Sequence, residues 1–269
     1  MPSGAACLLD LGPSSFNKRG ATTANTEIPM SDDHHHHHAD LRSYGRRRAR
    51  APSPRQQALW QEVLPRLAVP REASALDDPR ALFTPPMREV WLEIGFGGGE
   101  HLVWQAKTHP DVGIIGCEPF EDGVIKLVST VEAERLTNVR VHPDDARPLL
   151  RLLPDASLGR AFILFPDPWP KKRHHKRRIV STATLAEIAR LLRPGGELRI
   201  GTDVGAYAGA ILEVAQHQRV LRWIARGPED WRQRPADWPQ TRYEAKAIAA
   251  GRRCYFFRFE RSDPLASAS

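Results

Sequence analysis

Apolar and polar positions alternate in short blocks along most of the chain, and the blocks predict strands and helices in turn. Apolar runs bounded by polar or glycine-rich turns predict buried strands. These runs lie at 89–94, 112–117, 139–142, 160–165, 197–202 and 253–260. Between them, apolar residues at helical spacing predict helices at 56–67, 100–107, 120–135, 182–192 and 205–217. We expect Pro194-Gly195-Gly196 to end the helix at 182–192.

Strands that alternate with helices at this spacing predict an α/β fold, with a parallel sheet covered by helices on both faces. No internal repeat is apparent, and we expect residues 56–265 to form a single domain. Residues 1–40 are rich in small and polar residues without apolar periodicity, which predicts a disordered tail. Its five-histidine run at 34–38 is interpreted as a polar tract or a tag remnant rather than a metal site.

Positive charge is concentrated between residues 41 and 55, where six arginines occur without an acidic residue. This segment is interpreted as a basic arm that follows phosphates, with a solvated tail as the alternative. The whole chain of 269 residues has a formal net charge of +7, which favours an anionic partner. No apolar run is long enough for a membrane span, and no signal-peptide pattern is present.

The three cysteines are far apart and form no C-x-x-C pair, which indicates a reducing compartment and hence a cytoplasmic protein. No cluster of metal ligands is apparent. The pattern leaves open whether the protein is a monomer or a homodimer.

A glycine-rich turn, G-F-G-G-G at 95–99, directly follows the first strand of the predicted sheet. Glycines at this place let the backbone turn tightly and approach a ligand. Glu118 ends the next strand, 23 residues after Gly95, and this spacing is typical of a carboxylate that accepts the hydroxyls of a ribose. The pattern fits NAD or S-adenosylmethionine, and a surface glutamate beside an ordinary turn is the alternative.

Two details favour S-adenosylmethionine over NAD. The turn lacks the G-x-G-x-x-G order that accommodates a pyrophosphate, although Gly95 and Gly97 remain candidate cofactor contacts. Glu93 lies just before the turn, where a carboxylate would repel a pyrophosphate but suits a cationic sulfonium. Asp145, after the third strand, offers a carboxylate for the adenine amino group, with a helix N-cap as the alternative.

The segment 166–178, P-D-P-W-P-K-K-R-H-H-K-R-R, carries the most specific chemistry. Two prolines fix the backbone around Asp167. Trp169 can stack on a base or pack under the loop, and the eight residues after Pro170 are all Lys, Arg or His. A rigid acid beside an aromatic ring and a phosphate-binding run predicts an enzyme that acts on a base in nucleic acid.

Together these motifs resemble the bacterial tRNA (guanine-N7-)-methyltransferases from about residue 41 to 261. The resemblance rests on E-I-G-F-G-G-G-E at 93–100, F-P-D-P-W-P-K-K-R-H-H-K-R-R-I-V at 165–180, L-R-P-G-G-E-L-R-I-G-T-D at 192–203 and T-R-Y-E at 241–244. The 165–180 block is highly specific, whereas the glycine motif is generic. Arg242-Tyr243 and His175 depart slightly from the common pattern of the family, with charge or shape kept.

The resemblance implies a class I, Rossmann-like methyltransferase fold of seven strands whose last strand pair is antiparallel. It implies S-adenosyl-L-methionine as donor and tRNA as partner, and from the sequence we expect neither a metal nor a membrane partner. The implied cofactor contacts are Glu93, Glu118, Asp145 and Asp167, and Asp167 is the implied catalytic residue. The implied substrate contacts are Lys171, Arg173, His174, His175, Lys176, Arg177, Arg178, Asp203, Thr241, Arg242, Tyr243 and Glu244.

The chemistry of guanine agrees with these assignments. Guanine N7 has no proton to remove, so we expect positioning and charge stabilisation by Asp167 rather than a strong general base. Asp203 and Glu244 are candidates to accept the two donors of the Watson–Crick edge. The alternatives are a helix N-cap for Asp203 and a surface salt bridge for Glu244. Trp231 and Trp238 are expected either to form a wall of the RNA cleft or to pack within their loop.

Three other functions compete with this interpretation. Another class I methyltransferase would use the same glycine turn, and a non-catalytic RNA-binding module would retain a relic of the cofactor pocket. An NAD-dependent dehydrogenase is disfavoured by the turn and by Glu93.

Overall fold

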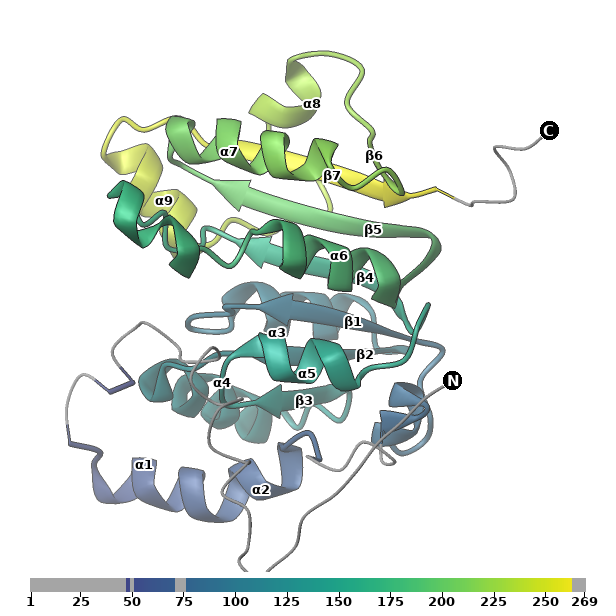
Figure 1. Cartoon of the computed structure of the whole chain (residues 1–269). Helices are drawn as coiled ribbons and strands as arrows, with labels where there is room; N and C mark the ends of the chain where they lie inside the picture. The colour runs from purple at the N-terminus through teal and green to yellow at the C-terminus, as the bar shows by residue number, and fades with distance from the viewer. Residues whose placement is uncertain (1–46, 49–50, 71–75, 263–269) are drawn as a thin grey trace, which may run out of the picture.

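The computed structural model of this chain describes residues 47–48, 51–70 and 76–262. Within these residues, the chain forms a seven-stranded sheet of order β3-β2-β1-β4-β5-β7-β6 (Figure 1). The strands are β1 (Glu89–Ile94), β2 (Val112–Cys117), β3 (Val139–His142), β4 (Leu158–Leu164), β5 (Leu192–Thr202), β6 (Leu221–Trp223) and β7 (Tyr255–Arg261). Strands β1 to β5 pair in parallel, and β7 is antiparallel to both β5 and β6. This is the class I methyltransferase fold, as expected.

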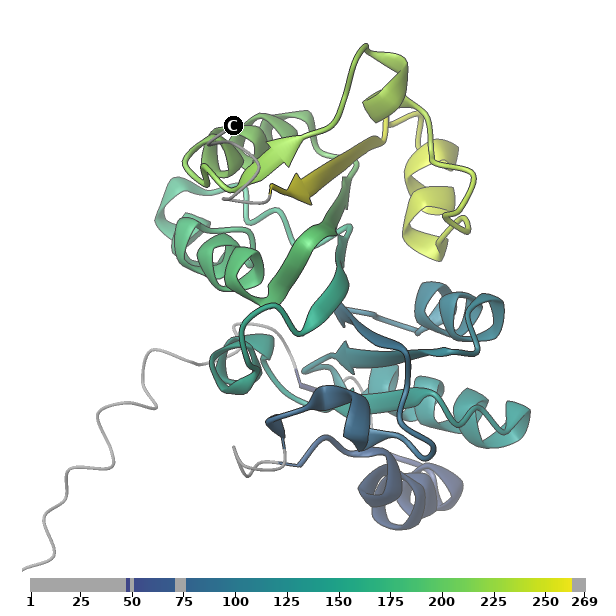
Figure 2. The ribbon, with the colours of Figure 1, turned by 90° about the vertical axis from the view of Figure 1, so that its right-hand side faces the viewer.

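Helices cover both faces of the sheet (Figure 2). One face is packed by α3 (Glu100–Thr108), α4 (Glu121–Glu134), α9 (Arg242–Ala249) and the N-terminal segments η2 (Leu59–Val63) and α2 (Leu64–Leu67). The other face is packed by α5 (Ala146–Leu152), α6 (Thr182–Leu191) and α7 (Gly205–Gln216). The shorter elements are α1 (Pro54–Ala58), η4 (Pro79–Leu82), η5 (Lys172–Arg177) and α8 (Glu229–Arg232).

The two-faced sheet explains the continuous apolar runs of the sequence. In β1, Val90, Leu92 and Ile94 belong to the core cluster beneath α5, α6 and α7, whereas Trp91 belongs to the cluster on the opposite face. Because successive side chains of a strand point to opposite faces, a strand buried on both must be apolar almost throughout.

The junction of α6 and β5 differs from the prediction. The helix ends at Leu191, and β5 begins directly at Leu192 and runs through the Pro-Gly-Gly segment. Pairing with β4 jumps from Leu158↔Leu192 to Arg160↔Glu197, so residues 193–196 bulge out of the ladder. Gly195 has φ +74°, a left-handed conformation that suits glycine. The glycines therefore form a bulge within the strand rather than a turn before it.

One other boundary and several short elements differ from the sequence prediction. Helix α1 begins at Pro54, where the Ser53 side chain accepts a hydrogen bond from the Gln56 backbone NH, so the last residues of the expected basic arm are helical. Helices α5, α8 and α9 and strand β6 were not predicted. Strand β6 has only three residues, too few for an alternation pattern to be recognised.

Several sequence predictions lie outside the described residues: the tail at 1–40 with its histidine run, most of the basic arm at 41–55, and residues 263–265. In the part of the chain that the structure describes, no helix is long and apolar enough to cross a membrane.

Candidate functional site

A cavity of about 390 Å³ opens at the carboxyl ends of β1, β2 and β4. Its lining residues are Ile94, Gly95, Gly97, Cys117, Glu118, Pro119, Phe120, Asp144, Asp145, Ala146, Arg147, Leu164, Phe165, Pro166, Asp167, Trp169, Arg177, Ile179 and Tyr243. Open α/β sheets bind ligands at this edge, and the volume lies in the range of small-molecule sites. The cavity brings together Gly95, Gly97, Glu118, Asp145 and Asp167, the residues predicted to contact the cofactor, with the exception of Glu93.

The glycine turn forms the floor of this cavity between β1 and α3. Gly95, Gly97 and Gly99 have φ values of +77°, +57° and +80°, which L side chains rarely adopt. Helix α4 packs against the turn at Gly123, where an added Cβ would lie 2.2 Å from the Gly97 carbonyl oxygen. The turn is therefore fixed by its own backbone and by the close approach of α4.

Glu118 braces the turn. Its Oε2 accepts a hydrogen bond of 2.8 Å from the Gly97 backbone NH, and its Oε1 accepts one of 2.9 Å from the Phe120 NH. Burial raises the pKa of the Glu118 carboxyl, and these two hydrogen bonds oppose the shift. An ionised carboxylate has about four acceptor positions, so two remain for the hydroxyls of a ribose. The residue thus fits the expected cofactor contact.

Asp145 is both a helix N-cap and a cavity residue, so the two interpretations of this residue are compatible. Its Oδ1 accepts a hydrogen bond of 2.9 Å from the Arg147 backbone NH at the start of α5, and its Oδ2 lies 3.1 Å from Arg147 Nη1. Two arginines of the basic arm reach the same region. Arg47 Nη2 lies 3.7 Å from Asp144 Oδ2, and Arg48 pairs with Glu121 at the start of α4.

Glu93 does not line the cavity. Its side chain lies on the face of the sheet that α3 covers and is 2% exposed. Glu93 Oε2 lies 2.7 Å from Nδ1 of His101 on α3. Gln105 Nε2 donates to the Asp237 carbonyl at 3.3 Å and lies 3.1 Å from His101 Nε2. A buried chain of hydrogen bonds therefore links the end of β1 to the loop before α9, and the geometry gives Glu93 a supporting position beneath the turn.

Asp167 lies exposed at the rim of the cavity, on the loop that follows β4. Phe165 and Trp169 on either side have φ values of +51° and +40°, which are strained for bulky residues and occur mainly at functional sites. The loop is fixed by a hydrogen bond of 2.8 Å from the Phe165 NH to the Gly201 carbonyl, and by one of 2.8 Å from Arg178 Nε to the Pro168 carbonyl. The carboxylate is therefore held on a rigid segment.

Trp169 lines the cavity beside Asp167 and is partly buried. The Arg177 guanidinium lies 4.9 Å from its ring centroid, and the His174 ring meets it edge-on at 5.8 Å. The indole thus packs against side chains of the basic run. The rest of the run forms η5, in which Lys172, Arg173, His175 and Lys176 are exposed, with exposed Lys171 just before it.

The two candidates for the guanine edge lie outside the cavity lining. Asp203, after β5, accepts a hydrogen bond of 2.7 Å from Arg252 Nε. Glu244 is 4% exposed and accepts one of 3.0 Å from Arg234 Nε. Burial raises the pKa of the Glu244 carboxyl, and Arg234 opposes the shift. Asp203 is not the N-cap of α7, because Val204 holds that position. The salt bridge of Glu244 does not lie at the surface, because the Glu244 side chain is buried.

Helix α9 connects the T-R-Y-E motif to the cofactor turn. Thr241 caps the helix by accepting a hydrogen bond of 3.1 Å from the Glu244 NH. Tyr243 projects into the cavity, and its Cε2 lies 3.0 Å from the position that a Cβ on Gly97 would occupy. The Arg242 guanidinium lies 5.5 Å from the Tyr243 ring. Tyr243 was expected to contact the substrate, and its ring lies against the cofactor turn.

Two alternatives were open for Trp231 and Trp238, a wall of the RNA cleft or packing within the protein. Trp238 is 2% exposed and packs in the core near His101 and Phe256. Trp231 stacks on Tyr255 at 6.1 Å. The alternative of packing is the better description for both residues.

Sequence reasoning missed Phe120 and Ile179 as cavity residues. The sequence could have indicated Phe120, because it directly follows the Glu118-Pro119 pair at the end of the second strand. Ile179 is brought to the cavity only by the fold of the 166–180 segment. Over the described ranges, no group of three or more His, Cys, Asp or Glu side chains is placed to hold a metal ion.

Comparison with known proteins agrees with this geometry. The model of a family described as "Putative methyltransferase" matches residues 87–257. A tRNA (guanine-N(7)-)-methyltransferase of Rhodospirillum rubrum is 49% identical over 227 residues, covering 82% of this chain and 88% of the relative. The protein of the same name from Hyphomonas neptunium is 48% identical over 208 residues, covering 77% of this chain and 94% of the relative.

Among solved structures, an antibiotic-related methyltransferase is 18% identical and covers 74% of this chain and 98% of its own, with a TM-score of 0.49. The fold assignment rests on the strand order described above. The extent and identity of the sequence matches place the chain in a family: it belongs to the bacterial tRNA (guanine-N7-)-methyltransferases.

Proposed function

We propose that this protein transfers a methyl group from S-adenosyl-L-methionine to N7 of a guanosine in the variable loop of tRNA. The observation that carries the proposal is the position of Asp167. Its carboxylate stands on the rim of the cavity that holds Gly97 and Glu118, and the cationic segment η5 continues from the same loop. A nucleoside cofactor and an RNA backbone would thus meet on either side of this acid.

The residues of the cavity fit the cofactor. Glu118 retains two acceptor positions beyond its bonds to Gly97 and Phe120, and Asp145 offers a carboxylate at the far end of the cavity. Phe120, Ile179 and Ala146 supply apolar surface for a purine ring. When bound, S-adenosylmethionine supplies an electrophilic methyl group on a positively charged sulfur.

Asp167 would act through its charge. Methylation of N7 places a positive charge on the guanine ring, and a fixed carboxylate stabilises that charge more in the transition state than in the neutral ground state. The prolines on both sides and the hydrogen bond from Arg178 to Pro168 hold the carboxylate without further reorganisation. No proton is removed, so the residue need not be a base.

Selection of guanine falls to Asp203 or Glu244 in this proposal. Each carboxylate pairs with one arginine, Arg252 or Arg234, and its oxygens are acceptors that match the donors N1–H and the exocyclic amino group. Adenine presents an acceptor at N1 and would leave such a carboxylate partly unpaired. Lys171 and the cations of residues 173–178 would hold the tRNA phosphates.

The proposal places the enzyme in the cytoplasm, in agreement with the cysteine pattern. Activity on another RNA and retention of RNA binding without catalysis are the competing functions. Incubation with labelled S-adenosylmethionine and, in parallel, unmodified bulk tRNA and ribosomal RNA, followed by nucleoside mapping, tests all three. We expect label in N7-methylguanosine; label in another nucleoside, or only in ribosomal RNA, would refute the assignment, and no label with retained RNA binding would favour the non-catalytic module.

A further inference from the structure

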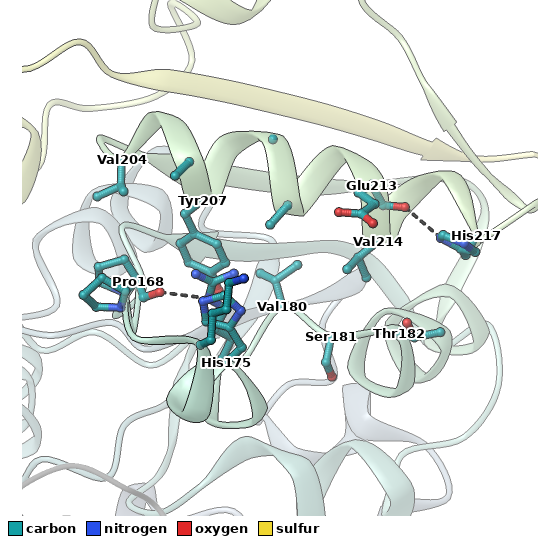
Figure 3. A pocket seen from close by; sticks show the side chains of 16 residues that line it. Pro168, His175, Val180, Ser181, Thr182, Val204, Tyr207, Glu213, Val214 and His217 are labelled. Atoms are coloured by element: carbon teal, nitrogen blue, oxygen red, sulfur yellow. Dashed lines mark hydrogen bonds between the residues drawn. The ribbon is translucent and has the colours of Figure 1, made fainter.

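A second hollow, a groove of about 760 Å³, lies between the segment 168–182 and helix α7 (Figure 3). One wall comes from α7, where Ala206, Gly209, Ala210, Glu213 and His217 recur at spacings of three or four residues and so share one helix face. The other wall contains Pro168, Pro170, Lys172, His175, Arg178, Val180, Ser181 and Thr182. The bond of 3.2 Å from Gln218 Nε2 to the Thr182 carbonyl joins the two walls at one end.

The groove and the cofactor cavity share one dividing wall. Along residues 167–170 and 177–180 the side chains alternate, with Asp167, Trp169, Arg177 and Ile179 facing the cavity and Pro168, Pro170, Arg178 and Val180 facing the groove. A nucleic acid chain that brings a base to Asp167 must therefore pass along the border of the groove.

The chemistry of the groove changes along its length. Lys172 and Arg178 supply cationic side chains and His175 an imidazole at one end, and Val180, Ala210 and Val214 make the middle apolar. Glu213 and His217 lie at the other end, away from His175 (Figure 3). This order suits a ligand with an anionic group, a flat apolar body and a hydrogen-bond donor at its far edge, which is the order of phosphate, ring and amino group in a nucleotide.

Arg178 is pre-organised for such a ligand. Its Nε donates to the Pro168 carbonyl at 2.8 Å, and its guanidinium lies 4.7 Å from the ring centroid of Tyr207, a buried residue of α7. A cation that is already fixed loses little side-chain entropy when it meets a phosphate.

We propose that this groove binds a nucleotide of the substrate RNA adjacent to the methylated guanosine. The phosphate would lie at Lys172, His175 and Arg178, and the base would lie between Val180 and α7 with its edge toward Glu213. A guanine that leaves its stack deprives a neighbouring base of a stacking partner, and the groove offers that neighbour a replacement surface. The inference rests on the proposed tRNA substrate but adds a site that tRNA methylation alone does not require.

Gly209 provides the test. An added Cβ at this position meets no atom within 4 Å, so a larger side chain would extend into the groove without disturbing the helix. Gly209→Leu fills the groove, and Gly209→Ala is its matched control, because both replace a glycine in a helix interior and should stabilise α7. We expect Gly209→Leu to raise KM for tRNA at least about fivefold relative to Gly209→Ala, since a stacked base contributes about 1–3 kcal/mol. The affinity for S-adenosylmethionine should stay the same in both variants.

Substrates with one abasic nucleotide identify the occupant. Wild-type enzyme should lose affinity for tRNA that is abasic at the 5′ or the 3′ neighbour of the target guanosine, and Gly209→Leu should lose nothing further on that substrate. Equal KM values for Gly209→Leu and Gly209→Ala on intact tRNA would overturn the proposal. The proposal would also be overturned if free adenosine or guanosine monophosphate bound tightly and Gly209→Leu abolished this binding without changing KM for tRNA. Failure of the proposed function is recognised separately, because wild-type enzyme would then form no N7-methylguanosine in the same assay.

Discussion

The ring of Tyr243 lies against Gly97, so the T-R-Y-E motif of α9 touches the turn on which the cofactor is expected to rest. A Cβ on Gly97 would lie 3.0 Å from Tyr243 Cε2 and 3.3 Å from its hydroxyl oxygen. A substrate that moves α9 would therefore also move a wall of the cofactor cavity, and binding of the two ligands should be coupled.

Gly97→Ala should weaken S-adenosylmethionine binding by about tenfold. The backbone at φ +57° disfavours a side chain by about 1–2 kcal/mol, and the new methyl group would press on Tyr243. In the double variant with Tyr243→Ala the steric part of the loss should disappear, so the two effects should not add. Calorimetric titration of all four proteins with the cofactor measures this. Strict additivity would show that the contact is without consequence.

Acid should weaken cofactor binding through Glu118. Burial raises the pKa of this carboxyl above its ordinary 4.5, and only the ionised form accepts freely from two ribose hydroxyls as well as from Gly97 and Phe120. The carboxyl gains a proton as the pH falls through the raised pKa, so the dissociation constant should rise and should begin to do so above pH 4.5. Glu118→Gln should bind about 10- to 100-fold more weakly and lose most of this pH dependence, because each charged hydrogen bond contributes about 1.5–3 kcal/mol. An unchanged pH profile in Glu118→Gln would assign the effect to another group.

Asp167→Asn should separate catalysis from binding. The amide preserves the shape of the side chain on its proline-flanked loop but removes the charge, so we expect kcat to fall by about 100-fold, as for other groups that stabilise developing charge. The cofactor affinity should change by less than about threefold. Single-turnover methylation of tRNA with saturating enzyme gives the chemical rate directly. A variant that retains the wild-type rate would show that the carboxylate does not act on the reacting base.

Replacement of Asp203 or Glu244, the carboxylates that pair with Arg252 and Arg234, should weaken recognition of guanine. Asp203→Ala and Glu244→Ala are each compared with wild type on tRNA that carries guanosine or inosine at the target position, since inosine lacks the exocyclic amino group. The variant that loses the edge contact should lose about 1–3 kcal/mol of discrimination, or about 5- to 150-fold, while cofactor binding survives. Unchanged kinetics in both variants would leave selection of guanine to other residues.

The sequence alone was sufficient to predict features that depend on residues close together in the chain. The five parallel strands, the turn at 95–99 and the acid at Glu118 follow from runs and spacings within about 25 residues, and apart from the earlier start of β5 the structure has them where they were expected. The strands are recognisable because burial on both faces demands uninterrupted apolar residues.

The features of the site that the sequence did not predict depend on contacts between residues far apart in the chain. Glu93 was expected to face the cofactor, but alternation along β1 turns it toward His101 on the other side of the sheet. Asp203 is paired with Arg252, 49 residues away, and no local pattern indicates that partner. The wall that α7 contributes to the second groove is likewise visible only once α7 lies beside residues 168–182.

The alternation within residues 167–170 makes the length of this loop as important as its composition. Because neighbouring side chains along residues 167–170 face opposite hollows, deletion of a single residue beyond Asp167 would shift the side chains that follow by one position. Trp169 would then face the groove and a proline would face the cofactor cavity, although the overall composition would barely change. Insertions and deletions here should therefore be tolerated, if at all, only in pairs.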